Sequence, residues 1–134
     1  MMKKIAFICV AVALVSLSVP VMAGEKLTAE EVKAAFVGNT YSFNLNSVEH
    51  PGSWGEQRFY LASDGNFYTK NSWGEESRGT YTIKDDGKVC YDFKEKPDVW
   101  KLPGELCLGY QKEGDVLKTS NGRTINAVTP GDAR

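Results

Sequence analysis

The stretch "GTYTIKDDGKVCYDF" (Gly79–Phe93) contains two runs in which apolar and polar residues alternate, with a short turn between them. Alternation with a period of two is typical of a β-strand that buries one of its faces. The central "DDGK" (Asp85–Lys88) carries the kind of glycine that tight hairpin turns favour. The stretch therefore predicts an antiparallel hairpin, with inward residues Tyr81, Ile83, Val89, Tyr91 and Phe93.

The same alternation recurs along most of the chain that follows Gly38. We expect about eight strands, at 40–45, 57–62, 66–70, 78–84, 88–93, 105–111, 115–119 and 123–128. One apolar and one polar face per strand is typical of an antiparallel sheet with a single buried face. The sequence predicts a mainly β fold, either an up-and-down barrel or a two-sheet sandwich, because both use this alternation.

One helix is expected before the first strand, in "LTAEEVKAAFVG" (Leu27–Gly38). Thr28 and Glu31 have the spacing of a capping box, and Gly38 can supply the left-handed residue that often ends a helix. The apolar side chains share one face, which comprises Val32, Ala35 and Phe36. We therefore expect the helix to pack on the sheet and to plug the end at which the tight turns lie.

The first 23 residues have the layout of a secretory signal peptide. Two lysines precede the apolar run Ile5–Val15, which is shorter than the ~20 residues that a membrane-spanning helix needs. "VMA" (Val21–Ala23) then offers a cleavage site. The sequence predicts an exported single β-rich domain over residues 24–134, with a disordered tail at 129–134.

The charge of the chain is mild. The net charge is −1, and loss of the signal peptide removes two of the 16 basic residues, which leaves −3. Both signs are scattered, whereas a nucleic-acid surface needs a basic stripe. Phosphate-binding glycine loops, dinucleotide fingerprints and calcium loops are also missing from the sequence. We expect no metal, no cofactor and no nucleic-acid partner.

Two cysteines remain after the signal peptide, Cys90 and Cys107. An even pair in an exported protein predicts a disulfide, and a metal site lacks partners because His50 is the only histidine. A hairpin centred between the two strands sets Cys90 opposite Cys107 and Tyr91 opposite Leu106. Since cross-strand neighbours share a face, this register supports the disulfide.

The tetrapeptide "SWGE" occurs twice, at Ser53–Glu56 and Ser72–Glu75. Tight turns alternate with three longer connections, and alternate connections of a meander lie at the same end. Each long connection holds one of the three tryptophans, which are Trp54, Trp73 and Trp100. We expect them to gather at one end, where they either recognise a partner or fold over the mouth and close the core.

Catalysis has weaker support in the sequence. His50 could act as a base, or Glu56 and Glu75 could form a carboxylate pair of the glycosidase type, as an envelope hydrolase would require. Solvated loop acids are common, however, and need no special role. The preferred hypothesis is a non-enzymatic binding module, such as an inhibitor, for a protein, peptide or glycan of the cell envelope. Its candidate binding residues are Trp54, Trp73, Trp100, Glu56, Glu75 and His50, and a third hypothesis is an accessory protein without a ligand.

Several short segments resemble a family of small exported bacterial β-domains of unknown function. These segments are "LTAEE", "GNT" (Gly38–Thr40), "FYLASDG" (Phe59–Gly65), "GTYTI" (Gly79–Ile83) and "DDGKVC" (Asp85–Cys90), with Cys107 later in the chain. The resemblance implies a secreted β-domain with a cysteine pair and brings no catalytic residue. The layout is also similar to small periplasmic barrels that inhibit lysozyme or proteases, at the level of fold analogy.

Overall fold

The computed structural model describes residues 24–45, 55–98, 100, 102 and 104–134. The predicted signal peptide, His50 and Trp54 lie outside these residues. The described chain is mainly β, as predicted, with one helix. Its elements are β1 (Glu25–Lys26), α2 (Ala29–Phe36), β2 (Asn39–Leu45), β3 (Gly55–Leu61), β4 (Asn66–Asn71), β5 (Glu76–Ile83), β6 (Val89–Glu95), β7 (Glu105–Leu108), β8 (Tyr110–Glu113), β9 (Val116–Thr119) and β10 (Ile125–Pro130).

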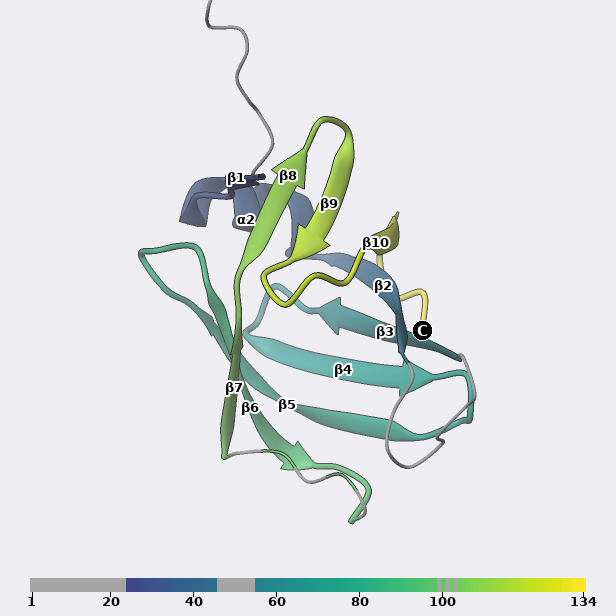
Figure 1. Cartoon of the computed structure of the whole chain (residues 1–134). Coiled ribbons are helices and arrows are strands. Elements are labelled where there is room, and N and C mark those ends of the chain that lie inside the picture. The colour runs from purple at the N-terminus through teal and green to yellow at the C-terminus, as the bar shows by residue number, and fades with distance from the viewer. Residues whose placement is uncertain (1–23, 46–54, 99, 101, 103) are drawn as a thin grey trace, which may run out of the picture.

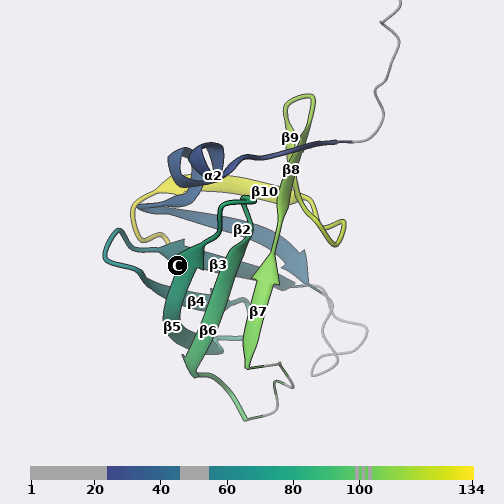
Figure 2. The same cartoon turned by 90° about the vertical axis from the view of Figure 1, so that its left-hand side faces the viewer.

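The strands form two antiparallel sheets. The larger has the order β10-β2-β3-β4-β5-β6-β7 and the smaller the order β1-β8-β9. The large sheet curls like half a barrel, and the small sheet and α2 lie across its upper end (Figures 1 and 2). The fold therefore combines features of both predicted architectures: a strongly curved sheet with a second, smaller sheet at one end.

Two differences from the predicted strands concern the small sheet. The predicted strand 105–111 is divided at Gly109 into β7, which pairs with β6, and β8, which pairs with β9. The backbone N–H and C=O of Gly109 both bond to Ser120, at 3.1 and 2.8 Å. The apolar alternation runs unbroken through Gly109, so the division leaves no sign in the sequence. The short strand β1 was also not predicted.

The helix begins as the sequence predicts. The backbone N–H of Glu31 donates to Thr28 Oγ1, and the N–H of Thr28 donates to Glu31 Oε1, which completes the capping box. Gly38 has a φ of 83°, and its N–H donates to the Leu61 carbonyl at 2.6 Å. The chain thus turns from α2 directly onto the sheet. Residues of α2 and of the turn after β3 line the same groove. The helix therefore lies at the tight-turn end, as expected.

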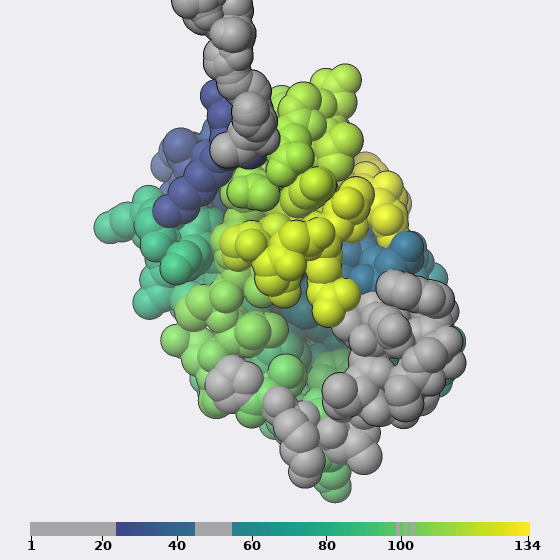
Figure 3. Space-filling model, in the orientation of Figure 1, coloured from purple at the N-terminus to yellow at the C-terminus, as the bar shows by residue number. Residues whose placement is uncertain are grey.

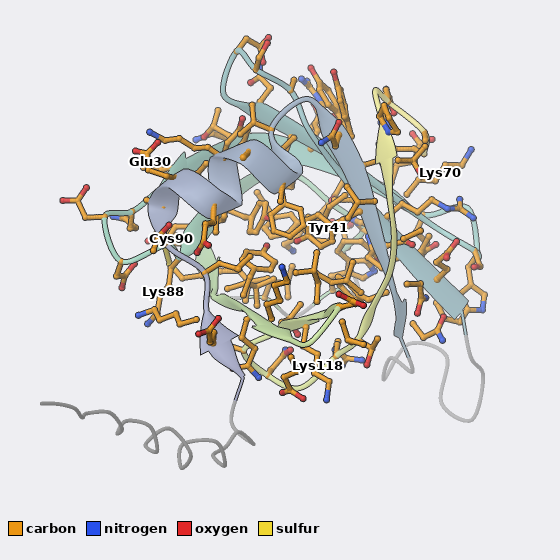
Figure 4. The ribbon with its side chains drawn as sticks, turned by 90° about the horizontal axis from the view of Figure 1, so that it is seen from above. Glu30, Tyr41, Lys70, Lys88, Cys90 and Lys118 are labelled. Carbon is orange, nitrogen blue, oxygen red and sulfur yellow. A yellow bond between two sulfur atoms is a disulfide. The ribbon has the colours of Figure 1, made fainter. Side chains whose placement is uncertain are left out.

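The core at this end contains three fully buried tyrosines. The hydroxyls of Tyr41, Tyr91 and Tyr110 lie 2.7 to 2.9 Å from one another and form a closed triangle of hydrogen bonds. The ring of Phe36 from α2 packs on Tyr41 and Tyr110, with centroids 4.9 and 4.7 Å away. Figure 4 shows Tyr41 among the interior rings beneath the helix. The helix therefore closes this end of the core, as predicted, and Phe36 is the residue through which it contacts the tyrosines.

Residues 129–134, predicted as a disordered tail, begin as part of the sheet. Thr129 and Pro130 continue β10 and pair with Thr40 and Asn39. Beyond the strand, the N–H of Ala133 donates to Thr40 Oγ1 at 2.8 Å. The polar tail shows no alternation, but it pairs because the edge of β2 presents backbone groups that need hydrogen-bond partners.

Cys90 and Cys107 form the predicted disulfide. They are direct cross-strand partners, and Tyr91 pairs with Leu106 beside them, in the register predicted from the sequence. Cys90 is buried, whereas Cys107 is exposed. The bond joins β6 to β7, the last strand of the large sheet.

Removal of this disulfide should lower the free energy of unfolding by about 3 kcal/mol, because the bond closes a loop of 17 residues. The measurement is urea unfolding of the wild type with and without reductant, beside a Cys90→Ala/Cys107→Ala variant. Reductant should leave the variant unchanged, which is the control. A reduced wild type as stable as the oxidised protein would contradict the prediction.

Candidate functional site

Gly55 and Glu56, the described residues of the first "SWGE" copy, meet the second copy at the end of the sheet away from α2. The backbone N–H of Ser72 donates to the Glu56 carbonyl at 2.9 Å, and the N–H of Glu56 donates to Ser72 Oγ at 2.7 Å. A Cβ on Gly55 would lie 2.6 Å from the Trp73 ring. The glycine of the first copy thus leaves room for the tryptophan of the second. This contact gives the repeated tetrapeptide a structural reason.

Asn71 and Glu75 hold two of the tryptophan connections together. Asn71 Oδ1 accepts the backbone N–H groups of Trp73 and Glu75, at 3.1 and 2.9 Å. Asn71 Nδ2 donates to Glu75 Oε1 at 2.9 Å, and the indole N–H of Trp100 donates to the same oxygen at 3.3 Å. The rings of Trp100 and Phe93 also form a T-shaped pair, with centroids 6.5 Å apart. Trp73 and Trp100 therefore lie at one end, as predicted, and Asn71, which the sequence analysis missed, organises them.

The two candidate carboxylates have different surroundings. Gln57 faces the interior of the large sheet, so Glu56 before it faces outward, where it pairs with Arg58 at 2.8 Å. Glu75 instead accepts hydrogen bonds from Asn71, a buried residue. This arrangement gives no support to a glycosidase-type pair. His50 and Trp54, the other candidates, lie outside the described residues.

A polar patch that was not predicted from the sequence lies inside this end of the sheet. Gln57, Thr69, Asn71 and Ser77 are all buried on the inner face. Thr69 Oγ1 and Ser77 Oγ are linked at 2.6 Å. The sequence offers one signal of the patch, since polar residues occupy inward positions of the alternating pattern near the long connections.

Other features of the described chain offer no alternative site. Its only cluster of three potential metal-ligating side chains is Cys90, Glu105 and Cys107, and both sulfurs there are joined in the disulfide. The groove beside α2 is lined by residues such as Lys33, Asp64 and Tyr81, none of which is a candidate site residue from the sequence. No helix within the described ranges is long and apolar enough to cross a membrane.

Comparison with protein families, curated proteins and solved structures gives no match for this chain. The resemblance to exported β-domains therefore remains a prediction from the sequence.

Proposed function

We propose that the protein is an exported, non-enzymatic binding module, such as an inhibitor, whose long-connection end contacts a protein, peptide or glycan of the cell envelope. One observation carries the proposal: two tryptophans from separate connections, Trp73 and Trp100, are fixed at the same end through hydrogen bonds to Asn71 and Glu75. Preorganised aromatic side chains bind partners at a low cost in conformational entropy. The disulfide supports export, because such bonds persist in oxidising compartments.

Burial supports recognition over closure of the core. Trp73 and Trp100 are both partly exposed, whereas the aromatic residues at the helix end are fully buried, among them Phe36, Tyr41 and Tyr91. The centre of the core is thus filled without either indole. Partly exposed tryptophans present an apolar face and an N–H group at the same surface, which suits recognition.

Replacement of both tryptophans in a Trp73→Ala/Trp100→Ala variant should abolish capture of the envelope partner by the mature protein. The free energy of unfolding should fall by less than about 2 kcal/mol, since neither ring is fully buried. The measurements are urea unfolding and pull-down from envelope extract. A Tyr60→Ala/Tyr68→Ala variant, which removes a stacked pair from the outer face, should retain capture. If the tryptophan variant unfolds, the residues belong to the core and the proposal fails.

A further inference from the structure

One buried amide of the inner polar patch has no hydrogen-bond partner. Gln57 is only 4% exposed, and its Nε2 atom bonds to nothing in the described part of the chain. A buried donor without an acceptor destabilises the folded state. Such a group in a native structure requires an explanation, and one explanation is an acceptor that binds from outside.

The described neighbours of Gln57 do not supply this acceptor. Its cross-strand partners are Phe43 and Asn71. Phe43 is apolar, and Asn71 Oδ1 already accepts two backbone N–H groups. The hydroxyls of Thr69 and Ser77 bond to each other. The N–H₂ group therefore lies unpaired and enclosed on the inner face, in a residue whose cross-strand neighbour is Phe43.

A second donor lies over the same ring. The Arg123 guanidinium is 5.9 Å from the centroid of Phe43. One of its nitrogens donates to the Asn44 carbonyl at 3.2 Å, and within the described ranges no carboxylate forms an ion pair with it. Phe43 thus pairs across the strands with a residue that carries an unpaired N–H₂ group, and a cation lies over its ring; both the N–H₂ group and the cation can only donate.

The large sheet is open between its two edge strands. Strands β7 and β10 are the two edges of the large sheet, and each pairs with one neighbour only. The hairpin of β8 and β9 bridges these edges near the helix end through the pair Lys118 and Thr124. Away from the helix the edges stay apart, and Figure 3 shows a hollow there, between the residues around 105–110 and those around 120–128.

We propose that Gln57 and Arg123 form a binding site for a small carboxylate whose apolar part rests on Phe43. A guanidinium matches the two oxygens of a carboxylate, and the Gln57 N–H₂ group adds a neutral donor. The site has one positive charge, which balances a monoanion better than a phosphate dianion. This proposal does not rest on recognition by the tryptophans, since neither Trp73 nor Trp100 contributes to it.

The test uses benzoate, its neutral isostere benzamide, and inorganic phosphate with the mature protein. Benzoate should shift the side-chain amide resonances of Gln57 in ¹⁵N-edited spectra and should raise the thermal unfolding midpoint, whereas benzamide should do neither. Equal binding of benzamide would show that binding does not require a negative charge on the ligand. Phosphate binding as tight as that of benzoate would show a general anion site. Either result would overturn the carboxylate assignment, as would the absence of any benzoate binding.

Matched variants separate the two donors from general effects on the fold. Gln57→Met keeps the length of the side chain without its donor, and Arg123→Gln removes the cation. Each variant should weaken benzoate binding at least about tenfold, because each loses one charge-assisted or buried hydrogen bond. Arg58→Gln, on the outer face, should leave binding unchanged, and so should Trp100→Ala, which tests the other proposal. If Gln57→Met binds benzoate like the wild type, the amide is an unpaired core group and the proposal fails.

Discussion

The folded protein should lose stability steeply as the pH rises above about 10, the usual pKa of tyrosine. Burial raises the pKa of Tyr41 and Tyr91 well above this value, and it raises the pKa of Tyr110 to about 12. The folded chain therefore keeps three protons that the unfolded chain releases. The stabilisation is complete below pH 10 and is lost as the pH rises toward the folded pKa values, by about 4 kcal/mol per pH unit.

The measurement is an alkaline titration followed by circular dichroism and by phenolate absorbance. We expect the phenolate signal of the three buried tyrosines to appear together with the loss of circular dichroism, between about pH 10 and 12, because the buried hydroxyls ionise only when the chain unfolds. Ionisation of all six tyrosines at about pH 10 in a protein that stays folded would contradict the prediction.

A set of phenylalanine variants provides the control for this titration. In the closed triangle each hydroxyl donates once and accepts once. Loss of one hydroxyl in Tyr110→Phe leaves a buried donor unpaired, which should cost about 1–3 kcal/mol at neutral pH. The triple variant of Tyr41, Tyr91 and Tyr110 leaves no unpaired donor, so it should be about as stable as the wild type and should lose most of the alkaline sensitivity. A triple variant that costs the sum of the three single changes would contradict this account.

Replacement of Phe36 by alanine should lower the free energy of unfolding by about 3–5 kcal/mol. The ring is completely buried, and it covers the tyrosine triangle through contacts with Tyr41 and Tyr110. Its loss creates a cavity and also opens the buried hydroxyls to water. The same variant should therefore show a weaker dependence of stability on alkaline pH, since hydrated tyrosines titrate closer to their usual pKa.

Urea unfolding at neutral and alkaline pH measures both effects of the Phe36 change. Phe36→Leu keeps most of the apolar volume and should cost less than the alanine variant, and Lys33→Ala, on the exposed side of α2, should change stability by less than about 0.5 kcal/mol. A Phe36→Ala protein that is as stable as the Lys33→Ala protein would show that the helix does not close the core.

These expectations assign different tasks to the two ends of the fold. The helix end contains the most completely buried rings and a satisfied set of hydrogen bonds, so changes there should act on stability. The opposite end contains partly exposed tryptophans, an unpaired buried amide and an arginine without a carboxylate partner in the described chain. Changes there should act on binding, and the control variants above test this division directly.

Only part of the candidate site was visible in the sequence. The count of strands between connections predicted that Trp73 and Trp100 lie at one end, because alternate connections of a meander share an end. The role of Asn71 was not visible, since its hydrogen bonds depend on the path of the connection after β4. The pairing of Gln57 with Phe43 joins two strands, and the approach of Arg123 requires β10 to return to the edge of β2.

The sequence by itself determined the features that depend on neighbouring residues or on one hairpin. The capping box of Thr28 and Glu31, the alternation of the strands and the register of Cys90 with Cys107 all have this local origin. Tertiary structure alone decided the division at Gly109, the pairing of residues 129–130 and the triangle of Tyr41, Tyr91 and Tyr110. The last two features join strands that are distant in the chain, and the first depends on which strand lies beside residues 105–111. A period of two shows which face a residue occupies without showing which strand will lie beside it.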